Sequence, residues 1–313
     1  MGEFKHISVL LNECIENLNI KEGGIYVDGT LGGAGHSYHI LKKLNGSGYL
    51  YCFDQDIAAI EASSKRLSTL SLPNFKLIHS NFQFMKQELE KIGINSVDGI
   101  LFDLGVSSYQ LDEGERGFSY NYDALLDMRM DQSSSLTAKD VVNRYSESEL
   151  TRIFFEYGEE KFSRKIAANI VKERKIKEIN TTFELVDIIK KSLPVQALRE
   201  KGHPAKRIFQ AIRIEVNGEL AILKESLSNA LKLLKPKGRM CVITFHSLED
   251  RIVKSLFNEV SSPKSWNRNM PIVLDDDKIE YKHVCKKPIL PSVEELEQNN
   301  RAHSAKLRVI EKL

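Results

Sequence analysis

The chain has 313 residues, of which 42% are hydrophobic and 28% are charged, and this composition excludes both an intrinsically disordered and a membrane-embedded protein. Its 45 Lys and Arg residues nearly balance its 43 Asp and Glu residues, which excludes a protein that holds nucleic acid by bulk positive charge alone. Residues 1–200 hold 24 basic and 29 acidic side chains, whereas residues 201–313 hold 21 and 14. An anionic partner is therefore expected at the C-terminal third.

The cysteines and the apolar stretches indicate the compartment. The four cysteines are far apart and lack the spacing of metal ligands, so we expect thiols in a reducing cytosol and no metal site. The N-terminus does not resemble a secretory signal, and no stretch approaches the roughly 18 apolar residues of a membrane span. We expect a cytoplasmic protein without a membrane partner.

Short apolar runs alternate with amphipathic segments through the first hundred residues. Such runs are typical of parallel strands that are buried on both faces, and the segments between them have the length of helices. We expect strands at 25–27, 48–53, 75–78 and 97–104, and helices at 36–44, 57–70 and 84–92. They would form the right-handed βαβ units of a doubly wound α/β domain.

The pattern changes near residue 112 and changes back near residue 205. The intervening chain is first polar and then has helical spacing from residue 137 to 193, with no strand pattern. After it we expect a helix at 205–235 that ends at Pro236-Lys237-Gly238, a strand at 239–244, a helix at 249–260 and a strand at 305–311. We therefore predict a discontinuous domain, 1–111 and 206–313, carrying an inserted helical substrate-binding domain, 112–205.

A glycine cluster follows the first predicted strand, in Asp28-Gly29-Thr30-Leu31-Gly32-Gly33-Ala34-Gly35-His36. Glycines allow a tight turn and a close approach of the backbone to a ligand at a helix N-terminus, although such turns also occur for steric reasons alone. Asp54 ends the second strand, where a carboxylate accepts hydrogen bonds from both hydroxyls of a ribose. Together they favour a cofactor that contains a nucleoside.

The same loop discriminates between cofactors. It contains neither G-x-G-x-x-G nor the Gly-Lys-Ser/Thr of a nucleoside triphosphate site. Asp28 would repel a pyrophosphate but attract a sulfonium, which favours S-adenosylmethionine over NAD. The alternative role for Asp28 is a helix cap or a hydrogen bond within the loop.

The fourth strand and its loop, Asp98–Gln110, together with Val27–Ser37, resemble the ribosomal RNA small subunit methyltransferase H family, also called MraW. Further matching segments are Lys5–Leu11, Glu115–Ser119, Leu126–Asp131, His203–Arg207, Phe209–Arg213, Thr244–Arg251 and Arg301–Arg308. The resemblance implies a class I S-adenosylmethionine-dependent methyltransferase fold with a helical domain inserted after the fourth strand. It also implies methylation of N4 of a decoding-centre cytidine in 16S rRNA, within the small (30S) ribosomal subunit.

Site residues are carried over by their place in the motifs. The resemblance implies cofactor contacts at Ala34, Gly35, His36, Asp54, Phe82, Asp103 and Gln110, and we add Asp28 and Gly33 from the glycine loop. Tyr109 stands where the family usually has a proline, so the loop loses a stiffening residue.

A cytosine amine is a poor nucleophile because its lone pair is delocalised into the ring, so acceptors that bind its N–H groups would favour transfer. We expect Asp103 and backbone carbonyls of Leu104–Ser108 to be these acceptors, so that Asp103, Ser107 and Ser108 belong to the catalytic loop at the end of the fourth strand. The alternative is that Asp103 only caps this loop.

Basic residues near the predicted catalytic end are candidates for RNA contact. We expect Lys206, Arg207 and Arg213 to contact phosphate, and His246 to contact RNA, although this histidine could instead be a base or satisfy a core hydrogen bond. The insertion adds Arg164, Lys165, Lys172, Arg174, Lys175 and Lys177, which would equally suit a solvated face.

Two other functions stay open at this point. A non-catalytic assembly factor of the small subunit would use the same fold, and a nicotinamide-dependent oxidoreductase would share the sheet and Asp54 but lacks its phosphate loop. The sequence leaves a monomer and a homodimer equally open.

Overall fold

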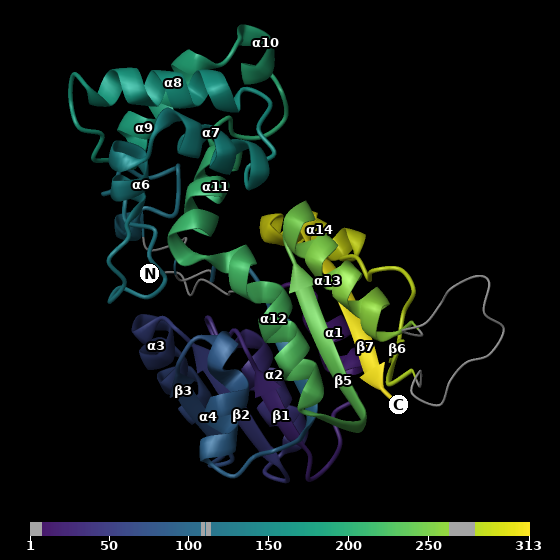
Figure 1. Cartoon of the computed structure of the whole chain (residues 1–313). Helices are drawn as coiled ribbons and strands as arrows, with labels where there is room; N and C mark the ends of the chain where they lie inside the picture. Colours follow the sequence, from purple (N-terminus) through teal and green to yellow (C-terminus); the bar gives the residue numbers. More distant parts are fainter. Residues whose placement is uncertain (1–7, 108–109, 111–113, 263–278) are drawn as a thin grey trace, which may run out of the picture. The chain divides into compact units, whose positions relative to one another are not determined.

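The computed structural model describes residues 8–107, 110, 114–262 and 279–313, and the chain forms two compact units (Figure 1). Unit 1 consists of Met1–Gly105 and Ala221–Leu313, and unit 2 consists of Val106–Leu220. In the described part of the chain, no helix is long and apolar enough to cross a membrane.

Unit 1 is built on a seven-stranded sheet of order β3-β2-β1-β4-β5-β7-β6. Its strands are β1 (Ile25–Asp28), β2 (Tyr49–Asp54), β3 (Phe75–His79), β4 (Val97–Asp103), β5 (Leu234–Thr244), β6 (Tyr281–His283) and β7 (Lys306–Lys312). The first five are parallel, whereas β7 is antiparallel to both β5 and β6. This order confirms the predicted class I methyltransferase fold.

Helices cover both faces of this sheet. Neighbouring residues of a strand point to opposite faces, so each strand contributes side chains to two separate cores. Val27, Phe53 and Phe102 belong to a core with α4 (Met85–Lys91), α12 (Glu219–Lys232) and α13 (Ser247–Val260). Tyr26, Cys52 and Leu101 belong to a second core with α1 (Leu11–Asn17), α2 (Gly35–Leu44) and α3 (Ile57–Ser68). Unit 1 also contains α14 (Val293–Gln298) and the 3-10 turns η1 (Phe82–Phe84) and η4 (Asn300–Ser304).

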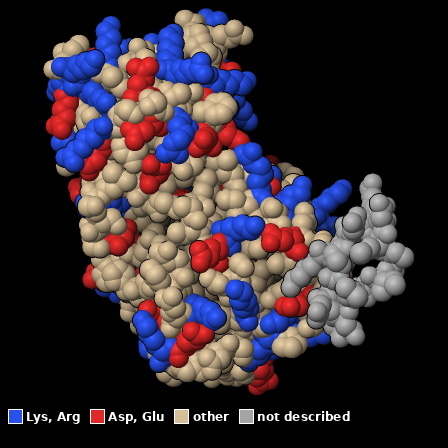
Figure 2. Space-filling view, in the orientation of Figure 1, with Lys and Arg blue, Asp and Glu red and all other residues tan. Residues whose placement is uncertain are grey.

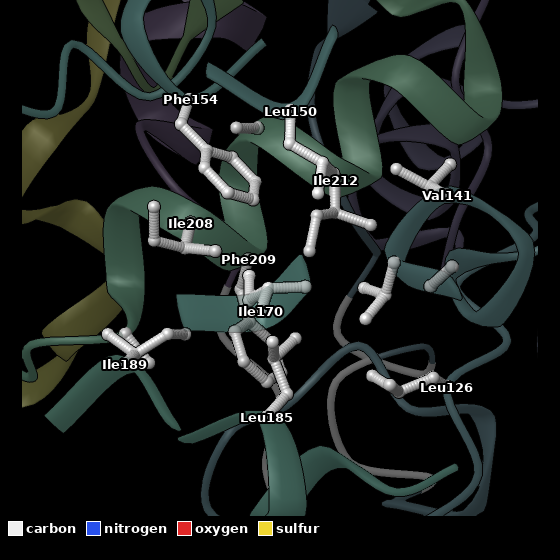
Figure 3. Close-up of a cluster of buried hydrophobic side chains, with 14 of the residues drawn as sticks. Leu126, Val141, Leu150, Phe154, Ile170, Leu185, Ile189, Ile208, Phe209 and Ile212 are labelled. Carbon is white, nitrogen blue, oxygen red and sulfur yellow. The ribbon is translucent and has the colours of Figure 1, made fainter. Parts of the chain in front are cut away.

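Unit 2 is helical and has its own hydrophobic core (Figure 3). Its elements are η2 (Gly114–Arg116), α6 (Ala138–Arg144), α7 (Glu147–Glu156), α8 (Ser163–Arg174), α9 (Thr182–Ser192), α10 (Val195–Leu198) and α11 (Lys206–Asn217). Capping boxes start α6, α7 and α9, where Thr137, Ser146 and Thr181 each bond an acid three residues later. The apolar residues of these helices meet around Phe154, which is fully buried.

The predicted helix at 205–235 is wrong, because two helices occupy this segment. Gly218 has φ +60° and ends α11 in the left-handed region, and α12 begins at the next residue. The apolar side of α11, including Ile208 and Phe209, packs in the core of unit 2. The units therefore meet in sequence at 105/106 and 220/221, not at the predicted 111/112 and 205/206.

Short elements account for the other differences. The sequence prediction omitted α1, α14 and β6 and started the fifth strand at residue 239. In the structure β5 already begins at Leu234, and its pairing with β4 shifts register across Pro236–Gly238. The sequence predicts that Pro236-Lys237-Gly238 ends a helix, whereas in the structure these residues interrupt the regular pairing inside β5.

Candidate functional site

The glycine loop joins β1 to α2 in a tight turn. Gly32 has φ +48° and Ala34 has φ +57°, so the chain passes twice through the left-handed region before the helix starts. A Cβ on Gly29 would lie 2.4 Å from the Phe102 ring, whereas a Cβ on Gly33 would meet no atom within 4 Å. The loop thus packs tightly on the sheet at Gly29 and leaves open space at Gly33.

Helix α3 holds the open part of this loop in place. Arg66 Nη1 donates to the Gly33 carbonyl at 2.6 Å, and Ser63 Oγ donates to the Gly32 carbonyl at 2.7 Å. The Asp54 carboxylate accepts from the Gly32 N–H at 2.8 Å. The backbone of the loop is therefore positioned by three side chains, and two of them, Ser63 and Arg66, were missed by the sequence analysis because nothing in their spacing marks a contact with the loop.

Gly35 is required for packing at the start of α2. A Cβ there would lie 1.7 Å from Ser8 Oγ and 3.1 Å from Ser8 Cβ. We expect Gly35→Ala to lower the free energy of unfolding by about 1–3 kcal/mol, the usual cost of overpacking. Denaturant unfolding without ligand measures this, and a Ser8→Gly/Gly35→Ala variant should recover part of the loss. Wild-type stability of Gly35→Ala would contradict the steric explanation.

Asp28 braces the loop from the end of β1. Its Oδ1 accepts from the Thr30 N–H at 3.1 Å and its Oδ2 accepts from Ser37 Oγ at 2.6 Å, with 1% of the residue exposed. Burial raises the pKa of Asp28 to about 6. These bonds show the predicted role of Asp28 in hydrogen bonding within the loop, and its role toward a sulfonium stays a prediction.

Asp54 lies at the end of β2. Its Oδ2 accepts from the Gly32 N–H at 2.8 Å and its Oδ1 from the Asp56 N–H at 2.9 Å. Burial raises the pKa of Asp54 to about 6, although both N–H bonds oppose the shift. Each carboxylate oxygen has two lone pairs, so one acceptor position on each oxygen stays available for a ligand hydroxyl.

Asp103 ends β4 with one unused oxygen. Its Oδ1 is covered and accepts no hydrogen bond from any residue in the described ranges, while 28% of the side chain as a whole is accessible. Burial, together with the charges of Asp28 and Glu249, raises the pKa of Asp103 well above its usual range. The Asp103 N–H donates to Thr30 Oγ1 at 2.6 Å, which ties this strand end to the glycine loop.

His36 is buried beside Asp103. A carbonyl only accepts, so His36 Nε2 carries a proton and donates to Val9 O at 3.1 Å. This places Nδ1 3.6 Å from Asp103 Oδ2. Nδ1 of His36 therefore faces the carboxylate of Asp103 at slightly more than hydrogen-bond distance.

Phe82 begins η1 after β3 and contacts Phe102 of β4 edge to face, with the ring centroids 5.6 Å apart. The preceding Asn81 caps this turn by accepting from the Gln83 N–H at 3.0 Å. The predicted cofactor residues of unit 1 thus lie in the glycine loop and just at or after the carboxyl ends of β1, β2, β3 and β4, the edge where ligands of open α/β sheets bind.

The remaining loop residues belong to unit 2. Ser107 Oγ accepts from the Gln110 N–H at 3.2 Å, and Gln110 Oε1 accepts from the Ser107 N–H at 3.0 Å. These two bonds brace the loop locally, a role that the sequence analysis did not assign to them. Ser108 and Tyr109 lie outside the described residues.

His246 is a helix cap. Its Nδ1 accepts from the Glu249 N–H at 3.4 Å, and Glu249 Oε2 accepts from the N–H groups of Phe245 and His246 at 2.8 and 3.3 Å. Its Nε2 is 3.1 Å from Glu249 Oε1, although the geometry is poor for a hydrogen bond. The spacing of three residues is that of a capping box, which could have revealed Glu249 as a partner in the sequence.

The basic residues predicted to contact RNA differ in their surroundings. Lys206 is exposed, and Arg207 is 3.8 Å from Glu160 with half of its side chain accessible. Arg213 donates through Nε and Nη2 to both oxygens of Glu219, at 2.8 Å each, and only 15% of its side chain is accessible. Its guanidinium is therefore engaged inside unit 2, whereas Lys206 and Arg207 present charge to solvent.

Comparisons with known proteins agree on one family. Residues 3–313 match the model of the MraW methylase family. Proteins named ribosomal RNA small subunit methyltransferase H from Clostridioides difficile and Streptococcus dysgalactiae are both 55% identical, covering 99% of this chain and 100% and 98% of theirs. A solved rRNA methylase from Streptococcus thermophilus is 12% identical with a TM-score of 0.41, covering 98% of this chain and 99% of its own, which is only a loose likeness.

Proposed function

This chain belongs to the MraW methylase family, and from that premise we propose that it transfers a methyl group from S-adenosylmethionine to the exocyclic N4 of a decoding-centre cytidine in 16S rRNA, acting on the small ribosomal subunit in the cytoplasm. The proposal rests on two features of unit 1. These are a loop and a carboxylate that suit a nucleoside cofactor, and an unused acceptor beside them.

The residues at the ends of β1 and β2 fit S-adenosylmethionine. Asp54 keeps one acceptor position on each oxygen for the two ribose hydroxyls, and the open space at Gly33 admits a ligand against the loop backbone. The nearby charge of Asp28 suits a sulfonium. When bound, this cofactor supplies an electrophilic methyl group for an attacking nitrogen.

The unused Asp103 oxygen is the observation that carries the proposed chemistry. A covered carboxylate oxygen without a partner among the described residues is costly unless a ligand completes it. An exocyclic amine would donate an N–H to the partly accessible Asp103 carboxylate and so orient its lone pair. Positioning of this kind supplies much of the acceleration of an in-line displacement. The neighbouring His36 can hold the proton that the amine releases.

The deciding experiment uses labelled S-adenosylmethionine and small subunits from cells that lack the enzyme. We expect label on N4 of a single decoding-centre cytosine. Label on another atom or base would contradict the N4 assignment. Binding to subunits without any label would favour the non-catalytic assembly factor.

Cofactor affinity should depend on pH through Asp54. Its pKa is raised to about 6, so the carboxylate becomes protonated as pH falls through 6 and loses strength as an acceptor for the ribose hydroxyls. We expect the affinity for S-adenosylmethionine to be constant above about pH 7 and to fall, by up to about tenfold per pH unit, below 6. Calorimetric titration between pH 5 and 8 measures this. In Asp54→Asn the affinity should be lower at pH 7.5 and should vary less with pH, because residue 54 no longer titrates while Asp28 still does.

A further inference from the structure

The cations of unit 2 fall into two groups that differ in their partners. In its first part every described Lys or Arg makes a bond, either to an acid or, for Arg116, to backbone carbonyls. These residues are Arg116, Arg129, Lys139, Arg144 and Arg152. Residues 161–207 hold 13 basic and 5 acidic side chains, and most of these cations have no acidic partner in the part of the chain that the structure describes.

Helix α8 concentrates the unpaired charge on one side. Arg164, Lys165, Lys172 and Lys175 are exposed and follow the spacing of a single helix face, which we call the cationic face of α8. No acid lies on this face, and it extends over about 16 Å at 1.5 Å per residue.

Two basic residues of the same segment do not belong to this face. Arg174 Nη1 donates to the Val142 carbonyl at 2.7 Å, and Lys177 pairs with Glu184. On the neighbouring helix α9, Lys190 and Lys191 are exposed without an acidic partner in the described ranges, and the bond from Asn169 to Ser192 joins that helix end to the middle of α8. Figure 2 shows Lys and Arg side chains, alongside acidic ones, at the end of unit 2 where α8 and α10 lie in Figure 1.

This charge pattern is unfavourable for the helix itself. Lys172 and Lys175 are three residues apart, a spacing at which like charges repel. Other helices of the unit place opposite charges on neighbouring turns, four residues apart, as in Arg144–Asp140 and Arg152–Glu156. A local charge pattern that lowers stability, and that no other contact in the structure compensates, is typical of a functional surface.

The opposite face of α8 excludes insertion into a bilayer. Ile166, Ala167 and Ile170 are fully buried in the core of unit 2, so the helix has no apolar face to offer a membrane. An array of exposed cations on a helix whose apolar side is buried suits a polyanion, and Lys and Arg are the side chains that contact nucleic-acid phosphates.

We infer that the cationic face of α8, extended by Lys190 and Lys191, binds the phosphate backbone of the substrate RNA. This inference rests on the proposed function for the identity of the RNA. The surface positions the RNA on unit 2 without reading its sequence, because phosphate contacts carry no sequence information.

The test compares two full-length triple variants with equal loss of charge. Lys165→Gln/Lys172→Gln/Lys175→Gln neutralises the proposed surface, and Lys43→Gln/Lys76→Gln/Lys254→Gln neutralises three exposed lysines scattered over unit 1. Binding of a naked 16S rRNA transcript is measured between 50 and 200 mM salt. For the first variant we expect at least about tenfold weaker binding at 100 mM and a log–log salt slope reduced by about two to three, with little change in the control.

Further measurements on the first variant show whether the lost charge acts on RNA binding alone. It should keep its melting temperature and its stabilisation by S-adenosylmethionine, and should show a raised KM for small subunits with an unchanged kcat. The inference would be overturned by an unchanged RNA affinity and salt slope in the first variant, or by an equal loss of RNA affinity in the control. It would also be overturned if the first variant lost binding to anionic lipid vesicles but not to RNA. Failure of the proposed function is distinct, because the wild type would then bind RNA with this salt dependence but place no label on cytosine N4.

Discussion

Asp103→Asn should lower kcat about 10²–10³-fold while the protein stays folded. The substitution keeps the size of the side chain but replaces a charged acceptor by a neutral one at the oxygen that meets no described residue. Loss of one preorganised polar contact to the reacting group typically costs this much. Single-turnover methylation of small subunits measures the change.

Stability separates this effect from damage to the fold. The pKa of Asp103 is well above its usual range because of burial and of the charges of Asp28 and Glu249, so its ionised form is unfavourable in the folded protein. Removing the charge should leave the melting temperature equal or higher. Full turnover with unchanged cofactor affinity in Asp103→Ala would contradict the catalytic role and leave only the loop-capping alternative.

The pH dependence of turnover follows from the same pKa. If Asp103 must be ionised to accept from the amine, activity is lost as pH falls through its raised pKa, well above the usual carboxyl range.

The parallel part of the sheet was predictable because each strand is a short apolar run with a clear end. Burial on both faces makes the residues of β2 before Asp54, and those of β4 between Asp98 and Asp103, apolar or glycine, so the closing Asp54 and Asp103 stand out in the sequence. The glycine loop was equally readable. The element β6, by contrast, has three residues and no pattern of its own, and it exists only because β7 offers an edge for pairing.

The second unit boundary could not be read from periodicity. The apolar face of α11 predicts burial, but periodicity does not tell which core buries it, and Gly218 in an otherwise helical pattern signals a break only weakly. The sequence also does not tell which charged residues are paired with an acid in the folded protein. Arg213 and Lys206 look alike in the sequence, yet one is held by Glu219 and the other is exposed.

Glu249→Ala should destabilise the protein by about 2–4 kcal/mol, because it strips partners from buried groups at the start of α13. Glu249 is 2% exposed and accepts from the N–H groups of Phe245 and His246, which would be left unpaired. Thermal unfolding should show a melting temperature lower by roughly 5–15 °C. A loss below about 0.5 kcal/mol would show that water or a neighbouring group replaces the carboxylate.

Conservative variants at the same cap connect its structure to catalysis. Glu249→Gln keeps an acceptor but removes a charge that raises the pKa of Asp103, so the acid limb of the pH–rate profile should move to lower pH. His246→Asn keeps a good helix cap, so wild-type stability with weakened RNA binding would assign His246 a contact with RNA. Wild-type RNA binding in that variant would restrict His246 to capping. The start of α13 would then act on the reaction through the charge of Glu249 alone.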